Sequence, residues 1–142
     1  MPKMEVNQMQ KFLSACSFGK DSLATIILAI RHNEPLDEAV YCEVMFDDDI
    51  SGEIPEHRDF IYSTAMPRLE AWGITTTVLR SKTTYVSGFQ RPITRGSGVG
   101  KIRSFPLCGR CCIQRDCKLV PINAYKKSLP DEVVQYIGYS SD

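Results

Sequence analysis

Apolar residues recur along the chain in short blocks, and segments rich in glycine, proline or charge separate these blocks. The block at 11–16 (KFLSAC) is short, apolar and followed by a glycine-containing turn, which predicts a buried strand. Residues 21–31 place apolar side chains around most of a helix circumference, so we expect a helix that is buried on more than one side. The blocks at 39–46 (AVYCEVMF) and 74–80 (ITTTVLR) predict a second and a third strand.

The remaining apolar positions predict two more helices and a last strand. A long helix over 55–72 would begin at a proline, which suits a first turn, and would end at Gly73. Pro67 is a point at which this helix could kink. A short helix is expected from Pro121 to about Ser128, and the final strand at 133–139 (VVQYIGY).

The alternation of strands and helices is typical of an α/β domain, in which a parallel sheet has helices on both faces. We interpret residues 1–142 as one such domain. The carboxyl ends of parallel strands share one edge of the sheet, and ligands bind there. Three polar segments would meet at this edge: 17–22, 47–49 and the long segment 81–107. The sequence therefore predicts a binding site at this edge.

The chain has no net charge, but its charges are unevenly distributed. Residues 1–79 include six Lys/Arg and thirteen Asp/Glu, whereas residues 80–127 include eleven Lys/Arg and one acid, Asp116, a local charge of +10. This asymmetry suits an anionic ligand such as a nucleotide, sulfate, phosphate or nucleic acid. A solvated basic face is the alternative.

The first ten residues contain no apolar signal region, and the apolar run at 23–30 is far shorter than the roughly 20 residues of a membrane span. We therefore expect a cytoplasmic protein without a membrane partner.

The basic segment at 81–107 has four glycines, two prolines and little periodicity, which is typical of a functional or mobile loop. Its stretch RGSGVGKI at 95–102 resembles a Walker A loop. However, it has three residues rather than four between its first and last glycine, and isoleucine follows its lysine where Ser or Thr is needed. We interpret Arg95, Lys101 and Arg103 as candidate anion contacts on a flexible basic lid. A disordered surface loop is the alternative.

The segment SFGKDS, between the first predicted strand and the first predicted helix, has the composition of a phosphate-binding loop. Gly19 allows the backbone to approach a ligand closely, and Ser17 and Ser22 supply hydroxyl groups. The start of the helix directs unpaired N–H groups toward the loop, and Lys20 adds a positive charge. The alternative is an ordinary strand-to-helix turn in which Asp21 caps the helix.

The same segment resembles the S-x-G-x-D-S signature of the PP-loop pyrophosphatases, the adenine nucleotide alpha-hydrolase group. Within that group, the chain resembles the phosphoadenosine phosphosulfate (PAPS) reductase family, including reductase-like proteins of phage and bacterial genomes. The resemblance continues through VMFDDD, IPEHRDFIY, WGI, CKLVPI and YIGYSSD, and covers most of the 142 residues. It implies an adenine nucleotide alpha-hydrolase-like, Rossmann-like fold. The tail looks like that of a family domain cut before its usual continuation.

The resemblance also implies which residues bind the nucleotide and which take part in catalysis. The phosphates of ATP or of a PAPS-type nucleotide would be held by Ser17, Phe18, Gly19, Lys20, Asp21 and Ser22, with Phe46 and Asp47 near the adenosine. Lys20 and Asp21 are the catalytic candidates, and with ATP a Mg²⁺ ion would bridge phosphate oxygens with help from Asp21. The family usually has glycine where this chain has Phe18.

Four of the six cysteines, Cys108, Cys111, Cys112 and Cys117, lie within ten residues of one another. The Cys108-x-x-Cys111 spacing is suited to metal chelation, which predicts a Zn²⁺ site or an iron–sulfur cluster. Reduced thiols are the alternative. Cys16 and Cys42 lie in strand patterns, and we expect both in the core.

Three functional hypotheses follow. The first is a PAPS-reductase-like enzyme of sulfur chemistry, acting with a thiol protein. The second is a PP-loop ATPase that adenylates an acceptor, such as nucleic acid, and releases pyrophosphate. The third is a non-catalytic nucleotide- or metal-binding module, because the chain lacks the C-terminal Glu-Cys-Gly-x-His segment that PAPS-cleaving reductases share.

Overall fold

The structure is a computed structural model that describes residues 10–104, 111–129 and 132–139. The described elements are β1 (Gln10–Ala15), α1 (Lys20–Arg31), β2 (Glu38–Cys42), α2 (Pro55–Phe60), the π-helical η1 (Ile61–Ala65), α3 (Met66–Ala71), β3 (Thr75–Leu79), α4 (Tyr85–Gln90), the π-helical η2 (Gln114–Leu119), α5 (Val120–Ser128) and β4 (Glu132–Tyr136). None of the described helices is long and apolar enough to cross a bilayer.

The four strands form one sheet in the order β3-β2-β1-β4, and every neighbouring pair is parallel. Ser14 of β1 is in register with Ala39 of β2, and Val40 of β2 with Thr77 of β3. The predicted α/β class with a parallel sheet is therefore confirmed. The carboxyl ends of all four strands share one edge, so the segments that follow β1, β2 and β3 begin at that edge.

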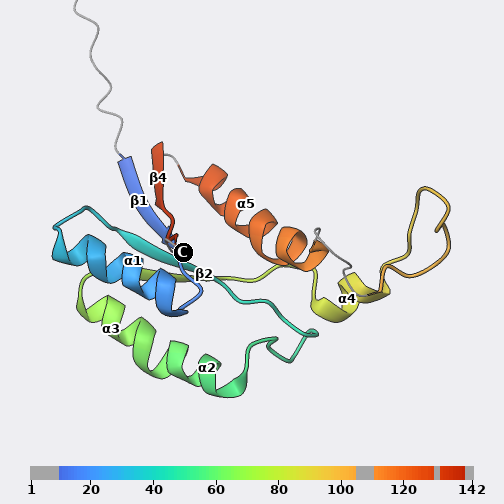
Figure 1. The fold of residues 1–142 in the computed structure, drawn as a ribbon, viewed down its shortest axis with the longest axis horizontal. Coiled ribbons are helices and arrows are strands. Elements are labelled where there is room, and N and C mark those ends of the chain that lie inside the picture. The colour runs from blue at the N-terminus through green and yellow to red at the C-terminus, as the bar shows by residue number, and fades with distance from the viewer. Residues whose placement is uncertain (1–9, 105–110, 130–131, 140–142) are drawn as a thin grey trace, which may run out of the picture.

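Helices cover both faces of the sheet (Figure 1). Alternate residues of β2 point to opposite faces, so Ala39 and Tyr41 pack into the core formed with α1 and the α2–α3 helix. On the other face, Glu38 is buried and accepts a hydrogen bond from Tyr125 of α5 at 2.6 Å. Lys11 pairs with the same carboxylate at 2.7 Å, so one buried glutamate joins β1, β2 and α5.

The helix expected over 55–72 is present, but it is not uniform. The wider π-helical turn η1 lies between α2 and α3, directly before Pro67. The ring of a proline collides with the carbonyl four residues earlier in a regular α-helix, and a wider turn relieves that collision. The helix ends where expected, because Gly73 adopts a left-handed φ of +81°.

Four expected boundaries were wrong. The strand expected over 133–139 ends at Tyr136, because its partner β1 ends opposite, with Ser14 in register with Tyr136. The strand expected over 39–46 ends at Cys42, because β3 ends opposite at Leu79 and an antiparallel bridge between Met45 and Ser51 turns the chain back. The segment expected to be a loop contains α4 and, after it, a hydrogen-bonded turn. The helix expected to start at Pro121 extends back through η2, where Pro121 has no N–H to give to the carbonyl of Cys117.

Candidate functional site

The loop between β1 and α1 has an unusual backbone that its own side chains stabilise. Phe18 adopts a left-handed φ of +59°, and its ring is 2% exposed and packs edge-on against Tyr41 with centroids 5.4 Å apart. Its N–H donates to the sulfur of Cys16 at 3.3 Å. The buried ring therefore anchors the loop. Glycine adopts a left-handed φ most easily, and phenylalanine rarely does.

The residues on either side of Phe18 meet at the start of α1. Gly19 is the N-cap, and Ser22 donates its hydroxyl proton to the Gly19 carbonyl at 3.0 Å. The hydroxyl oxygens of Ser17 and Ser22 lie 3.4 Å apart, and Lys20 and Asp21 are exposed in the first turn. The first N–H groups of a helix have no acceptor within that helix, so this corner combines amide donors, hydroxyls and an ammonium group. These groups suit an anion.

His57, which was not among the residues predicted for the site, lies beside this loop. Its Nε2 is 3.3 Å from the carbonyl oxygen of Ser17, and its ring stacks on Phe60. The histidine comes from the first turns of α2, which the loop after β2 brings to the sheet edge. No local pattern in the sequence indicates this contact, because Ser17 and His57 are far apart along the chain.

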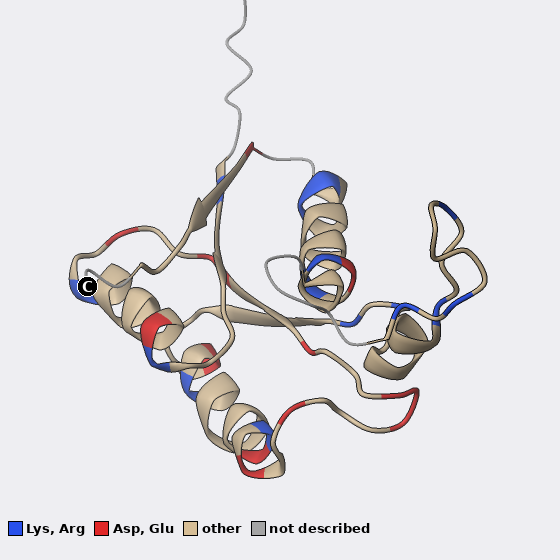
Figure 2. Cartoon of the chain, turned by 45° about the vertical axis from the view of Figure 1, so that its right-hand side comes forward, with Lys and Arg blue, Asp and Glu red and all other residues tan. Residues whose placement is uncertain are grey.

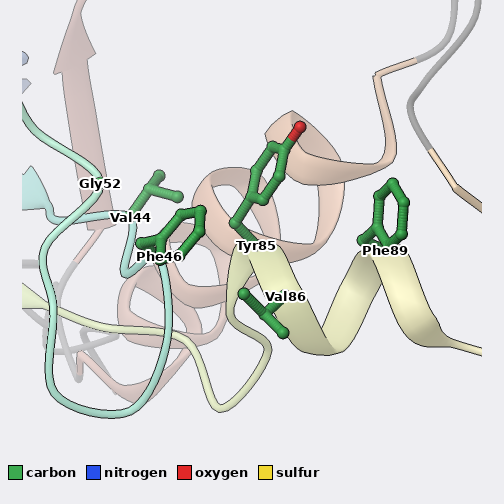
Figure 3. A pocket seen from close by; sticks show the side chains of 6 residues that line it. All are labelled: Val44, Phe46, Gly52, Tyr85, Val86 and Phe89. Atoms are coloured by element: carbon green, nitrogen blue, oxygen red, sulfur yellow. The ribbon is translucent and has the colours of Figure 1, made fainter.

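An apolar pocket of about 560 Å³ lies beyond the carboxyl end of β2. Its lining residues are Val44, Phe46, Gly52, Tyr85, Val86 and Phe89. Figure 3 shows the ring of Tyr85 between those of Phe46 and Phe89, and the Phe46 and Tyr85 rings stack with centroids 5.8 Å apart. The pocket thus lies between the loop after β2 and α4. Phe46 is the one residue of its lining that was a predicted site residue.

Helix α4 is held against that loop by backbone and capping hydrogen bonds. The N–H groups of Tyr85 and Val86 donate to the carbonyls of Met45 at 2.8 Å and Phe46 at 2.9 Å. Thr84 and Ser87 form a reciprocal capping box at the start of the helix. A six-residue helix is too short to be stable alone, so these contacts hold Tyr85 and Phe89 in position at the pocket.

Asp47 organises its own turn. Its Oδ1 accepts hydrogen bonds from the N–H groups of Asp49 at 2.9 Å and Ile50 at 2.7 Å. The carboxylate therefore stabilises the loop that presents Phe46, which is the local role that aspartate often has in turns.

No family model, no curated protein and no solved structure matches the chain. A functional assignment therefore depends on the geometry of the site and on the motifs in the sequence.

A buried carboxylate connects the elements around the sheet edge. Glu43 has no exposed surface, yet it accepts hydrogen bonds from Arg58 at 2.7 Å, Arg80 at 2.6 Å, Ser51 at 2.7 Å and Tyr62 at 2.9 Å. Burial alone would raise the pKa of Glu43, but these hydrogen bonds outweigh burial and hold the pKa at about 2. Glu43 therefore stays ionised and fixes both arginines.

The two arginines line a second pocket, of about 750 Å³, next to the apolar one. Four carboxylates also line it, those of Asp48, Asp49, Glu53 and Asp59. With Glu43 included, negative charges outnumber positive ones around this pocket, so it does not suit a free anion. The sequence shows Glu43 as the one acid within the apolar run AVYCEVMF. It does not show its hydrogen-bond partners, which lie up to 37 residues away along the chain.

The cysteine cluster falls partly outside the described residues, because Cys108 lies there. Cys111 is exposed, Cys112 is partly exposed, and Cys117 is buried with its thiol donating to the Thr83 carbonyl at 3.1 Å. Within the described ranges, no group of three or more His, Cys, Asp or Glu residues could hold a metal ion. The zinc or iron–sulfur site stays a prediction.

The two core cysteines are buried as expected. Burial raises the pKa of the Cys16 thiol, and it raises the pKa of the Cys42 thiol to about 11. The Cys42 thiol donates at 3.0 Å to the carbonyl of Cys117, the one that Pro121 cannot reach with an N–H.

The candidate anion contacts Arg95, Lys101 and Arg103 lie on a projection that follows α4 (Figure 1). None of the three lines the apolar pocket or the pocket beside Glu43. Figures 1 and 2 both place this projection apart from the start of α1. The structure thus does not bring these cations together with the Ser17–Ser22 loop as a lid.

Proposed function

We propose that this chain binds an adenine nucleotide, PAPS or ATP, and uses it in sulfur-transfer or reduction chemistry. The observation that supports this most strongly is the corner between β1 and α1. There two hydroxyls, an ammonium group and the first amides of a 12-residue helix lie at the carboxyl edge of a parallel sheet. The phosphates would bind at Ser17–Ser22, as the motif resemblance implies.

The apolar pocket is the proposed site of the adenine base. Its volume of about 560 Å³ lies within the range of small-molecule sites, roughly 300–1,000 Å³. Aromatic rings such as those of Phe46 and Tyr85 can pack against the flat face of a purine. The base and the phosphates would then bind beyond the carboxyl ends of two neighbouring strands, β2 and β1.

In the proposed reaction these residues mainly bind and orient groups. Lys20 would neutralise phosphate oxygens, and hydroxyl and amide donors would stabilise the charge that develops during transfer. If ATP is the substrate, the Asp21 carboxylate is the kind of oxygen ligand that Mg²⁺ prefers, with phosphate oxygens and water completing its shell.

Calorimetric titration of anaerobically purified protein with Mg·ATP, PAPS and adenosine phosphosulfate tests this proposal. We expect one of the three to bind, and Lys20→Ala and Asp21→Ala each to weaken it at least about tenfold, a loss of about 1.4 kcal/mol. Lys127→Ala, which removes an exposed lysine at the far end of α5, is the matched control and should leave affinity unchanged. Absence of binding, or binding that neither variant weakens, would overturn the proposal.

A second candidate function has its own support in the charge of residues 80–127, which is +10. A PP-loop ATPase that adenylates a nucleic acid needs both a nucleotide site and a basic surface. Preference for Mg·ATP with release of pyrophosphate would favour it, whereas release of sulfite from PAPS with a thiol protein would favour the reductase-like activity. Binding without turnover of either nucleotide would indicate a non-catalytic module.

A further inference from the structure

Residues 91–104, here called the arm, form a hydrogen-bonded hairpin that projects from the body beyond α4 (Figure 1). Its two sides are joined from Ile93 N–H to the Lys101 carbonyl at 2.8 Å and from Arg103 N–H to the Arg91 carbonyl at 2.9 Å. An antiparallel bridge pairs Pro92 with Ile102. The arm therefore presents its side chains from a defined backbone.

The arm has four cationic side chains, on Arg91, Arg95, Lys101 and Arg103, and no acidic one. Arg91 lies 3.9 Å from the carboxylate of Asp116. The other three are exposed, and none of them forms an ion pair with a carboxylate in the described part of the chain. Figure 2 shows positive residues on the arm and at its base. The negative residues near it lie on the loop after β2 and, in the case of Asp116, on η2. Asp116 also interacts electrostatically with Arg103, so this one acid partly offsets the charge of the arm. An anionic partner would neutralise the remaining positive charge.

The shape of the arm favours an extended polyanion over other anionic partners. Its cations are spread along both sides of a narrow hairpin, which matches a line of phosphates better than a compact anion. Two large apolar side chains of the arm are strongly exposed, those of Val99 and Ile102, so it lacks the broad apolar face by which an interfacial segment enters a membrane. The arm also lacks the aromatic anchors usual at the centre of protein interfaces.

The base of the arm is continuous with the wall of the apolar pocket. The arm begins directly after α4, and Ser104 N–H at its other end donates to the Phe89 carbonyl at 3.0 Å. Phe89 also lines the pocket. An extended polyanion bound along the arm would thus lead toward the apolar pocket, the proposed site of the adenine base.

We propose that the arm binds the phosphate backbone of a nucleic acid. The binding itself is independent of the nucleotide site. A further role, in which the bound nucleic acid is the acceptor next to the nucleotide, rests on the second candidate function, the adenylating ATPase.

Fluorescence anisotropy with labelled oligonucleotides of about 20 residues tests this proposal, using single-stranded RNA, single-stranded DNA and duplex DNA. The test variant is Arg95→Gln/Lys101→Gln. The matched control, Arg31→Gln/Lys127→Gln, removes the same charge from exposed positions at the ends of α1 and α5. We expect at least about tenfold weaker binding for the arm variant only. Its log–log salt slope between about 50 and 200 mM should be shallower by about 1.4 on single strands, or about 1.8 on duplex, for two lost phosphate contacts.

Three results would overturn the proposal: no binding of any oligonucleotide by the full chain, equal losses in both double variants, or equally tight binding of polyglutamate or of vesicles rich in phosphatidylserine. Titrations of the Lys20→Ala variant separate this proposal from the nucleotide proposal. Lys20→Ala should weaken the binding of ATP or PAPS and leave the affinity for the oligonucleotide unchanged. The arm variant should weaken oligonucleotide binding and leave the affinity for ATP or PAPS unchanged. Failure of one proposal would therefore leave the other measurable.

Discussion

Replacing Glu43 with glutamine would remove the charge that joins β2, α2 and β3 at the edge of the sheet. The carboxylate is fully buried and is the common acceptor for Arg58 and Arg80. Glutamine has nearly the same shape, but it is neutral and turns an N–H₂ group toward donors that need an acceptor. The change therefore tests the charge of Glu43 with little change in packing.

The expected cost follows from the pKa of Glu43, which the folded protein lowers from an ordinary value near 4.5 to about 2. At about 1.4 kcal/mol per unit, ionised Glu43 contributes about 3 kcal/mol to the free energy of unfolding at neutral pH. Because the folded pKa is the lower one, this contribution is fully present above about pH 4.5 and is lost as the pH falls toward 2. The difference between the parent protein and Glu43→Gln should therefore shrink to about half or less near pH 3.

Urea unfolding followed by circular dichroism at pH 7, 4 and 3 measures this difference. Glu56→Gln is the control, because Glu56 is exposed in the first turn of α2 and should change stability by less than about 0.5 kcal/mol. A difference below about 1 kcal/mol at pH 7, or one that does not narrow with falling pH, would refute the argument.

Substitutions that probe three further local features of the site follow. Phe18→Ala should lower the free energy of unfolding by about 3–5 kcal/mol, because it removes a buried ring. The Phe18→Gly variant should be about 1 kcal/mol more stable than the Phe18→Ala variant, because residue 18 has a φ of +59°. Urea titration compares the two variants. A more stable alanine variant would contradict the inference that the left-handed backbone at position 18 favours glycine. Gly138→Ala should cost about 1–3 kcal/mol, because its Cβ would meet the Thr25 hydroxyl and lie 3.1 Å from the Asp21 carbonyl. A companion Thr25→Ala change should recover part of that loss, and no recovery would argue against this contact. Thr84→Ala removes the capping box of α4 and should cost about 1 kcal/mol in thermal melts and weaken nucleotide binding. Unchanged affinity would mean that α4 does not shape the base site.

The sequence was most informative where structure depends on local patterns. The apolar blocks before Ser17 and around Ala39 predicted β1 and β2, and the parallel sheet followed from the alternation of strands and helices. The Ser17–Ser22 segment could be selected as a candidate phosphate-binding loop because its residues lie next to one another in the chain, and that role stays a prediction. The left-handed backbone of Phe18 was not predicted, since phenylalanine rarely adopts that conformation.

Features that depend on distant residues could not be predicted. Helix α4 has six residues with a glycine among them, too few for a helical period, and it is held by the carbonyls of Met45 and Phe46. The arginine partners of Glu43 come from positions 15 and 37 residues further along the chain. The apolar pocket was missed for the same reason, because half of its lining comes from α4.

The most direct test of the central claim is a nucleotide titration of ¹⁵N-labelled protein, followed by amide chemical shifts. We expect PAPS or Mg·ATP to shift the amides of Gly19 to Ser22 together with those of Phe46 and Tyr85, with one dissociation constant for both groups. Adenosine alone should shift only the second group, and inorganic phosphate only the first. No shifts at millimolar nucleotide, or the largest shifts away from both groups, would contradict the proposed nucleotide site.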